Sequence, residues 1–562
     1  MRFIHGLTIG VGIAVVASCA ASAPFNDRGA DVPNGTGGTG GGFISGSGGS
    51  AGGSASGCTS AAQCAPGFTC DLGTCVAPEV ETNRGLGDAP PVATPRYVYA
   101  LNPTAASVAR IDPTSLQIEA VPVGAGPVGL SALPKEDAAV VLCVGDGSLS
   151  VLDSTTLPTK VTRVSLKRQY SKLSVSPDGK YAVAWPDPSS APASGAEGIF
   201  ALVDLVKVRA GTSGAVAERA GGYRITDVVF RTEALVSTAL YVFAKSTVST
   251  FDLVTGDALP VRLPLPAAMA ADVNSREVVS SADGRVVMLR STVSPELASF
   301  DGTRIDTIPL PEIATDLDLV PDGTAAVAAL RSSGSVAYIE VPADLIDPTG
   351  IDTISLDGGV VGQVALPPQR PAGGMFAMVY STTGSAESFA RVDLPSGVVT
   401  RYALEKQVEE IALSPDGKSA LILHHADPAT TATDPYEAAV DRDQGFSVFD
   451  VATGFWQLQR TGTTRPSRYA FSPAGGYVGV ALRDDALKKY QLMAVNLGTL
   501  VSTTLPLPST PLFMGTVPEA PGITPHRVFV SQDHPAGRIS VIQLDSGQVR
   551  TATGFTLNGE IN

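Results

Sequence analysis

Residues 173–185 read LSVSPDGKYAVAW, and close variants return at 318–330 (DLVPDGTAAVAAL), 411–423 (IALSPDGKSALIL) and 470–482 (AFSPAGGYVGVAL). Each variant joins two short apolar strands through a Pro-Asp-Gly type turn. Proline presets φ, aspartate bonds the local backbone and glycine accepts the positive φ that closes a hairpin. A repeat of roughly 40–50 residues built only of strands is typical of a propeller blade. The sequence therefore predicts an all-β propeller.

The number of blades follows from counting hairpins. Weaker copies of the phrase bring the count to about nine between Tyr97 and Asn562: they lie around Asp283 and at Pro134–Val144, Val228–Val242, Pro367–Tyr380 and Pro511–Ser531. A partial unit at Tyr97–Val121 lacks a first strand. We expect the tail Thr551–Ile561 to supply it, so that a mixed blade joins both chain ends and leaves no exposed edge. Because propellers usually have about four to eight blades, we expect one ring of seven to nine four-stranded blades. Insertions among the hairpins, or two adjoining smaller rings, are the alternatives.

The third strand of several units ends in an aspartate followed by small turn residues, as at Asp112, Asp153, Asp204, Asp252, Asp393, Asp450 and Asp545. Aspartate in such a place hydrogen-bonds backbone N–H groups one to three residues further along. We interpret these residues as turn initiators and not as catalytic acids.

The segment YVYALNPTAASVARIDPTSLQIEAVPVGAGPVGLSALP (Tyr97–Pro134) resembles the YVTN-type β-propeller repeat, and the Ser-Pro-Asp-Gly turns resemble those of the TolB/WD40-like group. The resemblance extends from about Tyr97 to the C-terminus, although the first unit has Tyr97-Val98-Tyr99-Ala100 in place of the namesake tetrapeptide. It implies the propeller fold. It does not imply an activity, because the family includes binding proteins, scaffolds and a few enzymes.

The N-terminus has the features of an export signal over residues 1–18. Arg2 supplies the positive charge, Leu7–Val16 is a short apolar stretch, and small residues precede Cys19. This arrangement resembles the bacterial lipobox, which implies that Cys19 is diacylated, and the uncharged Ala20 implies outer-membrane sorting. An ordinary signal cleaved near Ala21–Ala23 is the alternative. We expect a lipoprotein of the cell envelope, or else a periplasmic or secreted protein.

Residues 19–57 form a Gly/Ser-rich stretch that cannot bury a core, and we expect a flexible tether there. Residues 58–78 contain four cysteines, Cys58, Cys64, Cys70 and Cys75. In an exported chain this spacing predicts two disulfides in a small knob, with three possible pairings. The alternative, a zinc knuckle, lacks a C-x2-C pair and a nearby histidine. Similar Cys-rich modules follow linkers in secreted proteins of myxobacteria-like bacteria. A linker at 79–95 and the propeller at 96–562 complete the predicted organisation, and Cys143 is expected to be a buried apolar residue.

Composition limits the classes of partner. The net charge is −15, with 39 lysines and arginines and no basic run longer than two residues. Nucleic-acid binding needs a concentrated basic face, so we expect no nucleic acid partner. The lipid on Cys19 would provide the membrane contact, and the partner would be a protein or glycan of the envelope.

Residues that could carry chemistry are few, and no cofactor is expected. The largest concentration of metal-ligating side chains is an insertion at 424–445, HHADPATTATDPYEAAVDRDQG. His424, His425, Asp427, Asp441 and Asp443 are the weak candidates for a metal or ligand site. Adjacent histidines at a strand end point to opposite faces, so a solvated loop is the favoured interpretation.

Three functional hypotheses follow. We expect a non-enzymatic binding or docking module whose rim or channel recognises an envelope component. The alternatives are a structural platform of an envelope complex and a lactonase-like hydrolase that uses the channel. The hydrolase would need a His/Arg/Glu or metal cluster there. Trp185 follows a blade strand and could lie at a rim, although core packing is the favoured interpretation.

Overall fold

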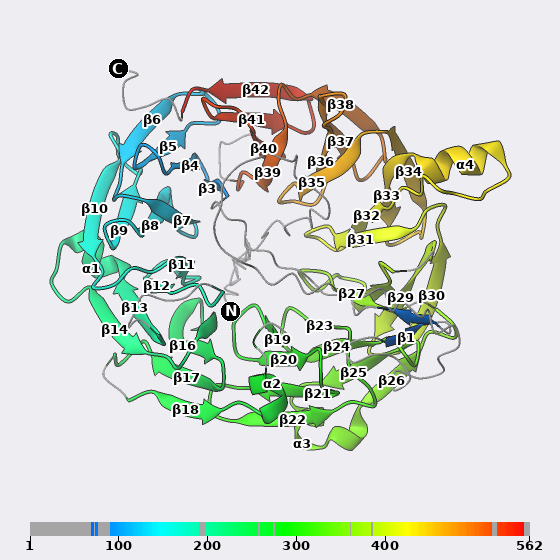
Figure 1. Cartoon of the computed structure of the whole chain (residues 1–562), viewed down its shortest axis with the longest axis horizontal. Helices are drawn as coiled ribbons and strands as arrows, with labels where there is room; N and C mark the ends of the chain where they lie inside the picture. The colour runs from blue at the N-terminus through cyan, green and yellow to red at the C-terminus, as the bar shows by residue number, and fades with distance from the viewer. Residues whose placement is uncertain are drawn as a thin grey trace, which may run out of the picture.

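The protein is a single ring of ten blades around a central channel (Figure 1). This computed structural model describes residues 69–71, 74–76, 90–189, 197–256, 259–271, 273, 276–359, 361–383, 386–519 and 525–555. Each blade is a sheet of four antiparallel strands in sequence order, with the first strand at the channel and the fourth at the outer wall. The β-propeller prediction is confirmed. The expectation of seven to nine blades is wrong, because every hairpin counted in the sequence, and the partial unit, forms a blade of its own.

The first five blades contain β3–β22. Their strands are, blade by blade, β3–β6 (Val92–Ala93, Val98–Asn102, Ser107–Ile111, Ile118–Pro122), β7–β10 (Pro127–Ala132, Ala138–Cys143, Ser148–Asp153, Lys160–Ser165), β11–β14 (Lys172–Val175, Tyr181–Trp185, Ile199–Asp204, Val216–Ala220), β15–β18 (Ile225–Glu233, Val236–Ala244, Thr247–Asp252, Val261–Pro264) and β19–β22 (Arg276–Ser280, Val287–Ser291, Glu296–Phe300, Ile305–Pro309).

The second five blades contain β23–β42. Their strands are β23–β26 (Asp316–Leu319, Ala325–Leu330, Ser335–Glu340, Asp352–Ser355), β27–β30 (Gln363–Ala365, Met375–Tyr380, Ser388–Leu394, Val398–Ala403), β31–β34 (Val408–Leu413, Ser419–His424, Gln444–Asp450, Trp456–Gly462), β35–β38 (Arg465–Phe471, Tyr477–Asp484, Lys489–Asn496, Ser502–Pro506) and β39–β42 (Pro511–Thr516, Arg527–Gln532, Arg538–Gln543, Gln548–Thr553). Short helices lie in the connections: α1 (Leu205–Ala210), α2 (Ala267–Ala271), α3 (Ala343–Ile346), α4 (Pro435–Arg442) and the 3-10 turn η3 (Pro348–Gly350).

The ring closes without the mixed blade expected from the sequence. The first blade takes its inner strand from β3, which lies before Arg96, while Thr551 belongs to β42, the outer strand of the last blade. A two-residue strand such as β3 has no detectable period, which is why the sequence concealed it. Closure comes from apolar packing of Val98 and Ala109 against Phe529 and other residues of the last blade, with a hydrogen bond from Arg527 Nη1 to Thr114 Oγ1 at 3.3 Å. Residues 556–562 of the expected tail lie outside the described residues.

The Pro-Asp-Gly turns interlock around one mouth of the channel. Gly284 has a φ of 67°, and a Cβ atom there would lie 2.2 Å from the carbonyl oxygen of Phe230 in the preceding blade. Asp178 also reaches a neighbouring blade, where it accepts hydrogen bonds from the backbone N–H and hydroxyl of Ser237 at 3.0 and 2.9 Å. Glycine therefore serves both the turn and the close approach of two blades, and aspartate links the blades as well as the turn.

Most of the aspartates that end third strands are turn initiators, as predicted. Asp252 Oδ1 accepts the backbone N–H groups of Val254 and Thr255 at 2.7 and 3.0 Å, and Asp112 makes the same kind of contact. Asp204 instead caps the N-terminus of α1 by accepting the N–H of Lys207. Asp153 and Asp450 also accept local backbone N–H groups. Asp393 and Asp545 differ, because their carboxylates accept side-chain hydrogen bonds from Arg391 and Gln543.

The core lies between neighbouring sheets. Second strands such as β24 (AAVAAL) and β8 (AAVVLC) are buried along their whole length, and alternate residues pack against the sheets on either side. Small alanines let the blades approach closely, while each fully buried Val or Leu contributes about 1.5–3 kcal/mol. Cys143 is a free buried thiol whose pKa is raised by burial, as an apolar core residue should be.

The cysteine-rich segment is described only in part. β1 (Thr69–Asp71) and β2 (Thr74–Val76) form an antiparallel hairpin in which Cys70 lies opposite Cys75. Cys19, Cys58 and Cys64 lie outside the described residues, so the lipidation and disulfide predictions stay predictions. Within the described ranges, no helix is long and apolar enough to cross a membrane.

Candidate functional site on the channel wall

The first strands of the blades bring charged residues to one mouth of the channel. Because the blades repeat one another around the ring, their first strands begin at the same mouth. Five of these strands, β7, β15, β31, β35 and β39, have a register shift close to their start, as between Val408 and Glu410. Such a bulge leaves a residue outside the ladder and redirects its side chain. Thr226 and Glu409 are the residues released in this way in β15 and β31.

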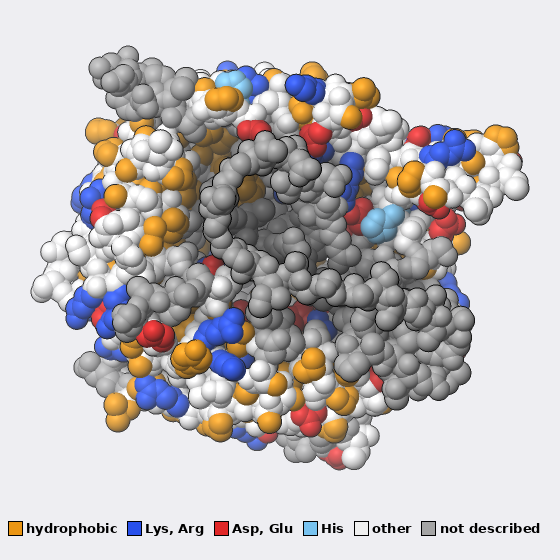
Figure 2. Space-filling view, in the orientation of Figure 1, with side chains coloured by type: hydrophobic (Ala, Val, Ile, Leu, Met, Phe, Trp, Pro, Cys, Tyr) orange, Lys and Arg blue, Asp and Glu red, His pale blue; other side chains and the backbone are white. Residues whose placement is uncertain are grey.

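The polar residues are unevenly distributed around this mouth. Carboxylates stand near the start of β15, β19, β23 and β31, at Asp227, Glu277, Asp316, Glu409 and Glu410. The start of β39 is apolar instead, and Leu512 there is 38% exposed. Figure 2 shows hydrophobic side chains gathered on the face of the first blades, at the upper left of the view.

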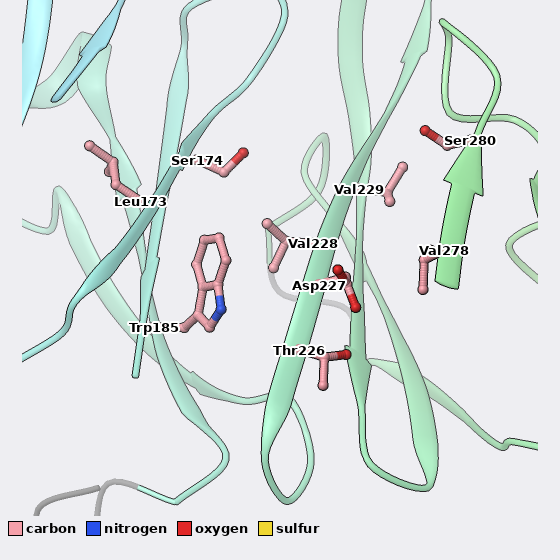
Figure 3. Close-up of a pocket in the computed structure, with 9 residues that line it drawn as sticks. All are labelled: Leu173, Ser174, Trp185, Thr226, Asp227, Val228, Val229, Val278 and Ser280. Atoms are coloured by element: carbon pink, nitrogen blue, oxygen red, sulfur yellow. The ribbon is translucent and has the colours of Figure 1, made fainter. Parts of the chain in front are cut away.

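A cavity of about 400 Å³ opens between β11, β15 and β19 (Figure 3). Its apolar wall includes Leu173, Val228 and Val278, and its polar groups are Asp227 and three hydroxyls, those of Ser174, Thr226 and Ser280. The volume is that of a small-molecule site, and more of the accessible lining is polar than apolar.

Asp227 is the cavity's ionisable residue. Its carboxylate makes no hydrogen bond or ion pair with the described residues; Arg276 is the neighbouring charge. The Arg276 guanidinium is held by Thr226 Oγ1 at 2.6 Å and by the carbonyl oxygens of Ala244 and Lys245 at 3.2 and 3.3 Å. Burial lowers the pKa of Arg276, and the negative charge of Asp227 opposes that shift. The Asp227 carboxylate thus faces the cavity, and the positive charge of Arg276 partly balances its negative charge.

Trp185 both packs in the core and lines the cavity. It is 8% exposed and contacts the apolar cluster that contains Phe200 and Leu240. Its Nε1–H is buried without a hydrogen-bond partner among the described residues. Figure 3 shows this nitrogen on the side of the indole turned toward β15. Core packing, the favoured interpretation, is confirmed. The sequence did not predict that Trp185 also lines a cavity.

Arg290 and two carboxylates form a buried network beside the cavity. Arg290 Nε lies 2.6 Å from Glu277 Oε2, and its Nη1 donates to the carbonyl oxygen of Ala314 at 2.9 Å. Asp316 accepts the N–H groups of Leu317 and Val364 at 2.9 and 2.7 Å. Burial and the charge of Glu277 raise the pKa of Asp316 well above its usual range. The network joins the fifth, sixth and seventh blades and has a structural role.

A second group of titratable residues surrounds the start of β31. Glu409 Oε1 lies 2.9 Å from Arg465 Nη2, and Glu409 Oε2 lies 3.9 Å from His425 Nδ1. Tyr469 donates a hydrogen bond of 2.6 Å to Glu410 Oε1. Burial, with the neighbouring charge of Glu409, raises the pKa of Glu410 to about 7 although the Tyr469 hydroxyl opposes the shift. A carboxyl with this pKa exchanges its proton near neutral pH.

The insertion after β32 does not bring its predicted ligands together. Burial lowers the pKa of His424 to about 3, and this residue is fixed by the Gln407 carbonyl and the Ser447 hydroxyl, 3.2 and 2.7 Å from its two ring nitrogens. Asp443 pairs with Arg460 at 2.7 Å. Among the described residues, no group of three or more His, Cys, Asp or Glu side chains is placed to hold a metal ion.

The rest of the insertion is ordered around α4. Asp434 caps the start of the helix, and Lys406 Nζ donates to the carbonyl oxygens of Val440 and Asp441 at its end, at 2.6 and 2.9 Å. Asp441 Oδ2 accepts the hydroxyl of Thr430, and Asp427 Oδ1 accepts the N–H of Ala429. The solvated loop favoured from the sequence is in part a short helix, which projects from the ring in Figure 1.

Sequence reasoning missed the residues of the cavity. The signal was a carboxylate within the first residues of an otherwise apolar first strand, as in ITDVVF, REVVS, DLDL and VEEIAL. In ITDVVF this carboxylate, Asp227, lines the cavity, whereas in REVVS and DLDL the carboxylates enter the buried network around Arg290.

Comparison with known proteins gives similarity at the level of overall shape. No family model and no curated protein matches the chain. Solved structures that match include a eukaryotic initiation factor (TM-score 0.47, 10% identity, 82% of this chain and 96% of that chain). Apo AztD from Citrobacter koseri (0.35, 11%, 65% and 92%) and the β-propeller domain of Cps50 (Swd1) from Myceliophteria thermophila (0.31, 14%, 59% and 96%) also match. At these scores the matches carry no inference about function, and the resemblance to the YVTN repeat stays an expectation from the sequence.

Proposed function

We propose that the chain is an exported β-propeller lipoprotein, anchored through Cys19, that acts as a non-enzymatic binding or docking module in the cell envelope. The observation that carries the proposal is the cavity beside Asp227 and Trp185, which opens on the channel of the ring. A recess of about 400 Å³ that presents a carboxylate and several hydroxyls beside apolar side chains suits a small polar ligand. The export signal and the tether that precede the ring support a location at the membrane surface.

Lipid anchoring is tested by labelling cells with radioactive palmitate, with and without globomycin, in the full chain and in Cys19→Ser. We expect label in the full chain that globomycin reduces and that the variant lacks. Absence of label in the full chain would refute the lipid anchor and leave a periplasmic or secreted binding protein.

Docking of an envelope component is tested by photo-crosslinking. A benzoylphenylalanine residue at Leu512, on the channel side, is compared with one at Val398, on the outer strand β30; both positions are exposed and apolar. We expect a crosslinked envelope component from position 512 and none from position 398. Equal products at both positions would favour the alternative of a structural platform, which uses the outer wall as well.

The hydrolase alternative has one observation in its favour, the grouping of Glu409, Glu410, His425 and Arg465 at the channel mouth. Glu410 would take a proton from water, whose oxygen attacks a lactone carbonyl. The ring C–O bond then breaks, and the leaving oxygen takes up a proton to give a hydroxy acid. Arg465 and His425 would stabilise the developing negative charge. A pH-stat assay with δ-valerolactone tests this: turnover by the full chain that Glu410→Gln abolishes would replace the binding proposal with this one.

A further inference from the structure

The walls of the cavity restrict what it can hold. We propose that it binds a neutral, polyhydroxylated ring of monosaccharide size. The inference rests on the proposed function, which it deepens by naming the class of ligand. A volume of about 400 Å³ accommodates such a ring with some water.

The charges favour a neutral ligand over an ionic one. The described residues that line the cavity include no lysine or arginine, so an anion would find no cation among them and would face the carboxylate of Asp227. A cation would meet Asp227, but Arg276 lies close enough to Asp227 for the two charges to interact, and its guanidinium would repel the cation. A hydroxyl group avoids both penalties, because it can donate to a carboxylate without bringing a net charge.

The hydrogen-bonding groups favour a ligand that both donates and accepts. Asp227 is an acceptor, and the hydroxyls of Ser174 and Ser280 can either donate or accept. Several hydroxyls around one small ring match this mixture.

The apolar part of the wall matches the remaining surface of a sugar ring. Leu173 lies on the β11 side of the cavity, and Val229 and Val278 lie on the β15 and β19 side (Figure 3). The C–H groups of a pyranose can pack between these side chains while its hydroxyls reach Asp227. Trp185 is too deeply buried to offer an open stacking face, and it closes one side of the cavity.

The chain contains its own reporter for this site. Its two tryptophans are Trp185 and Trp456, and Trp456 lies on the outer strand β34. In Trp456→Phe all tryptophan emission comes from the cavity wall. The purified full-length variant is titrated with D-glucose, D-galactose, D-mannose, L-rhamnose and N-acetyl-D-glucosamine up to about 100 mM. We expect a saturable change in the emission of Trp185 with at least one of them.

Two further variants test the role of the carboxylate. Adding Asp227→Asn to Trp456→Phe should weaken binding at least tenfold, because a hydrogen bond to a charged group contributes about 1.5–3 kcal/mol. Adding Asp352→Asn, at an exposed position on β26, should leave affinity unchanged. Thermal unfolding checks that all variants fold.

Absence of saturation with every sugar overturns the inference, as does saturation by phenethylammonium chloride in their place or equal affinity in Asp227→Asn. These failures would leave palmitate labelling and crosslinking at position 512 unchanged. The ligand class and the proposed function therefore fail separately.

Discussion

Replacing Glu410 by glutamine should stabilise the ring at alkaline pH and leave it unchanged at acidic pH. The carboxyl is buried beside Tyr469 and has a pKa of about 7, against an ordinary value of 4.5. Below pH 4.5 it is protonated in both the folded and unfolded chain. Between pH 4.5 and 7 the unfolded chain releases the proton while the folded chain keeps it. The stability of the native protein is therefore full below pH 4.5 and falls as pH rises to 7.

The size of this effect follows from the two pKa values. Their difference, 7 minus 4.5, multiplied by about 1.4 kcal/mol per unit, gives an upper limit of about 3.5 kcal/mol. Glutamine resembles the protonated carboxyl and can still accept the hydrogen bond from Tyr469, so it avoids the loss. For a ring of roughly 450 residues, with an unfolding entropy of about 2 cal/mol/K per residue, about 3.5 kcal/mol corresponds to a shift of about 4 °C in Tm.

The assay is differential scanning calorimetry of the native chain and of Glu410→Gln at pH 4 and pH 8. We expect equal Tm values at pH 4 and a higher Tm for the variant at pH 8. Glu405→Gln, at an exposed position in the connection that leads into β31, is the control and should show no difference at either pH. In Tyr469→Phe the pH range over which stability falls should extend above 7, because the lost hydrogen bond favoured the charged carboxyl. Equal Tm values for Glu410→Gln and the native chain at pH 8 would falsify the assignment of a buried, proton-retaining carboxyl.

Three further predictions concern the ring. Gly284→Ala should lower the free energy of unfolding more than Gly211→Ala, because both glycines have positive φ but a Cβ at 211 meets nothing within 4 Å. Chemical denaturation should show a loss of about 1 kcal/mol for Gly211→Ala and about 1–3 kcal/mol more for Gly284→Ala. Equal losses would contradict the interlocked turns. Asp178→Ala should lower stability by about 1–3 kcal/mol through the lost bonds to Ser237, against no change for Asp352→Ala, and a silent Asp178→Ala would remove that link between blades. Lys406→Met should raise the rate of amide hydrogen exchange in α4 at least fivefold, because the last carbonyls of the helix lose their donor, while β32 stays protected. Unchanged exchange in α4 would show that Lys406 does not stabilise the helix.

The sequence predicted the repeating hairpin well, because the turn residues and the apolar strands report the same unit independently. The nine hairpins and the partial unit counted in the sequence correspond to the ten blades of the structure. We expected fewer blades because propellers usually have no more than about eight. The missing strand, Val92–Ala93, could not be found, because two residues have no alternation.

The candidate site could be predicted less well, because its members are far apart in the sequence. Asp227 and Trp185 meet only when neighbouring blades are placed side by side. The distance between Asp227 and Trp185 also depends on the bulge at Thr226, which no local sequence pattern predicts. His424 illustrates the opposite case: a residue type that suggests chemistry is held in the core by a carbonyl and a hydroxyl.

The seam between the first and last blades bears on how the molecule is made. Among the described strands none crosses it, and the hydrogen bond between Thr114 and Arg527 joins residues 413 positions apart. The chain must therefore be complete before the circle can shut. Until then the first blade and the most recently formed one each present an uncovered apolar face. A chain that is only partly synthesised would carry both faces at once, so a chaperone would have most apolar surface to cover at this joint, and a stalled chain would associate with its neighbours there.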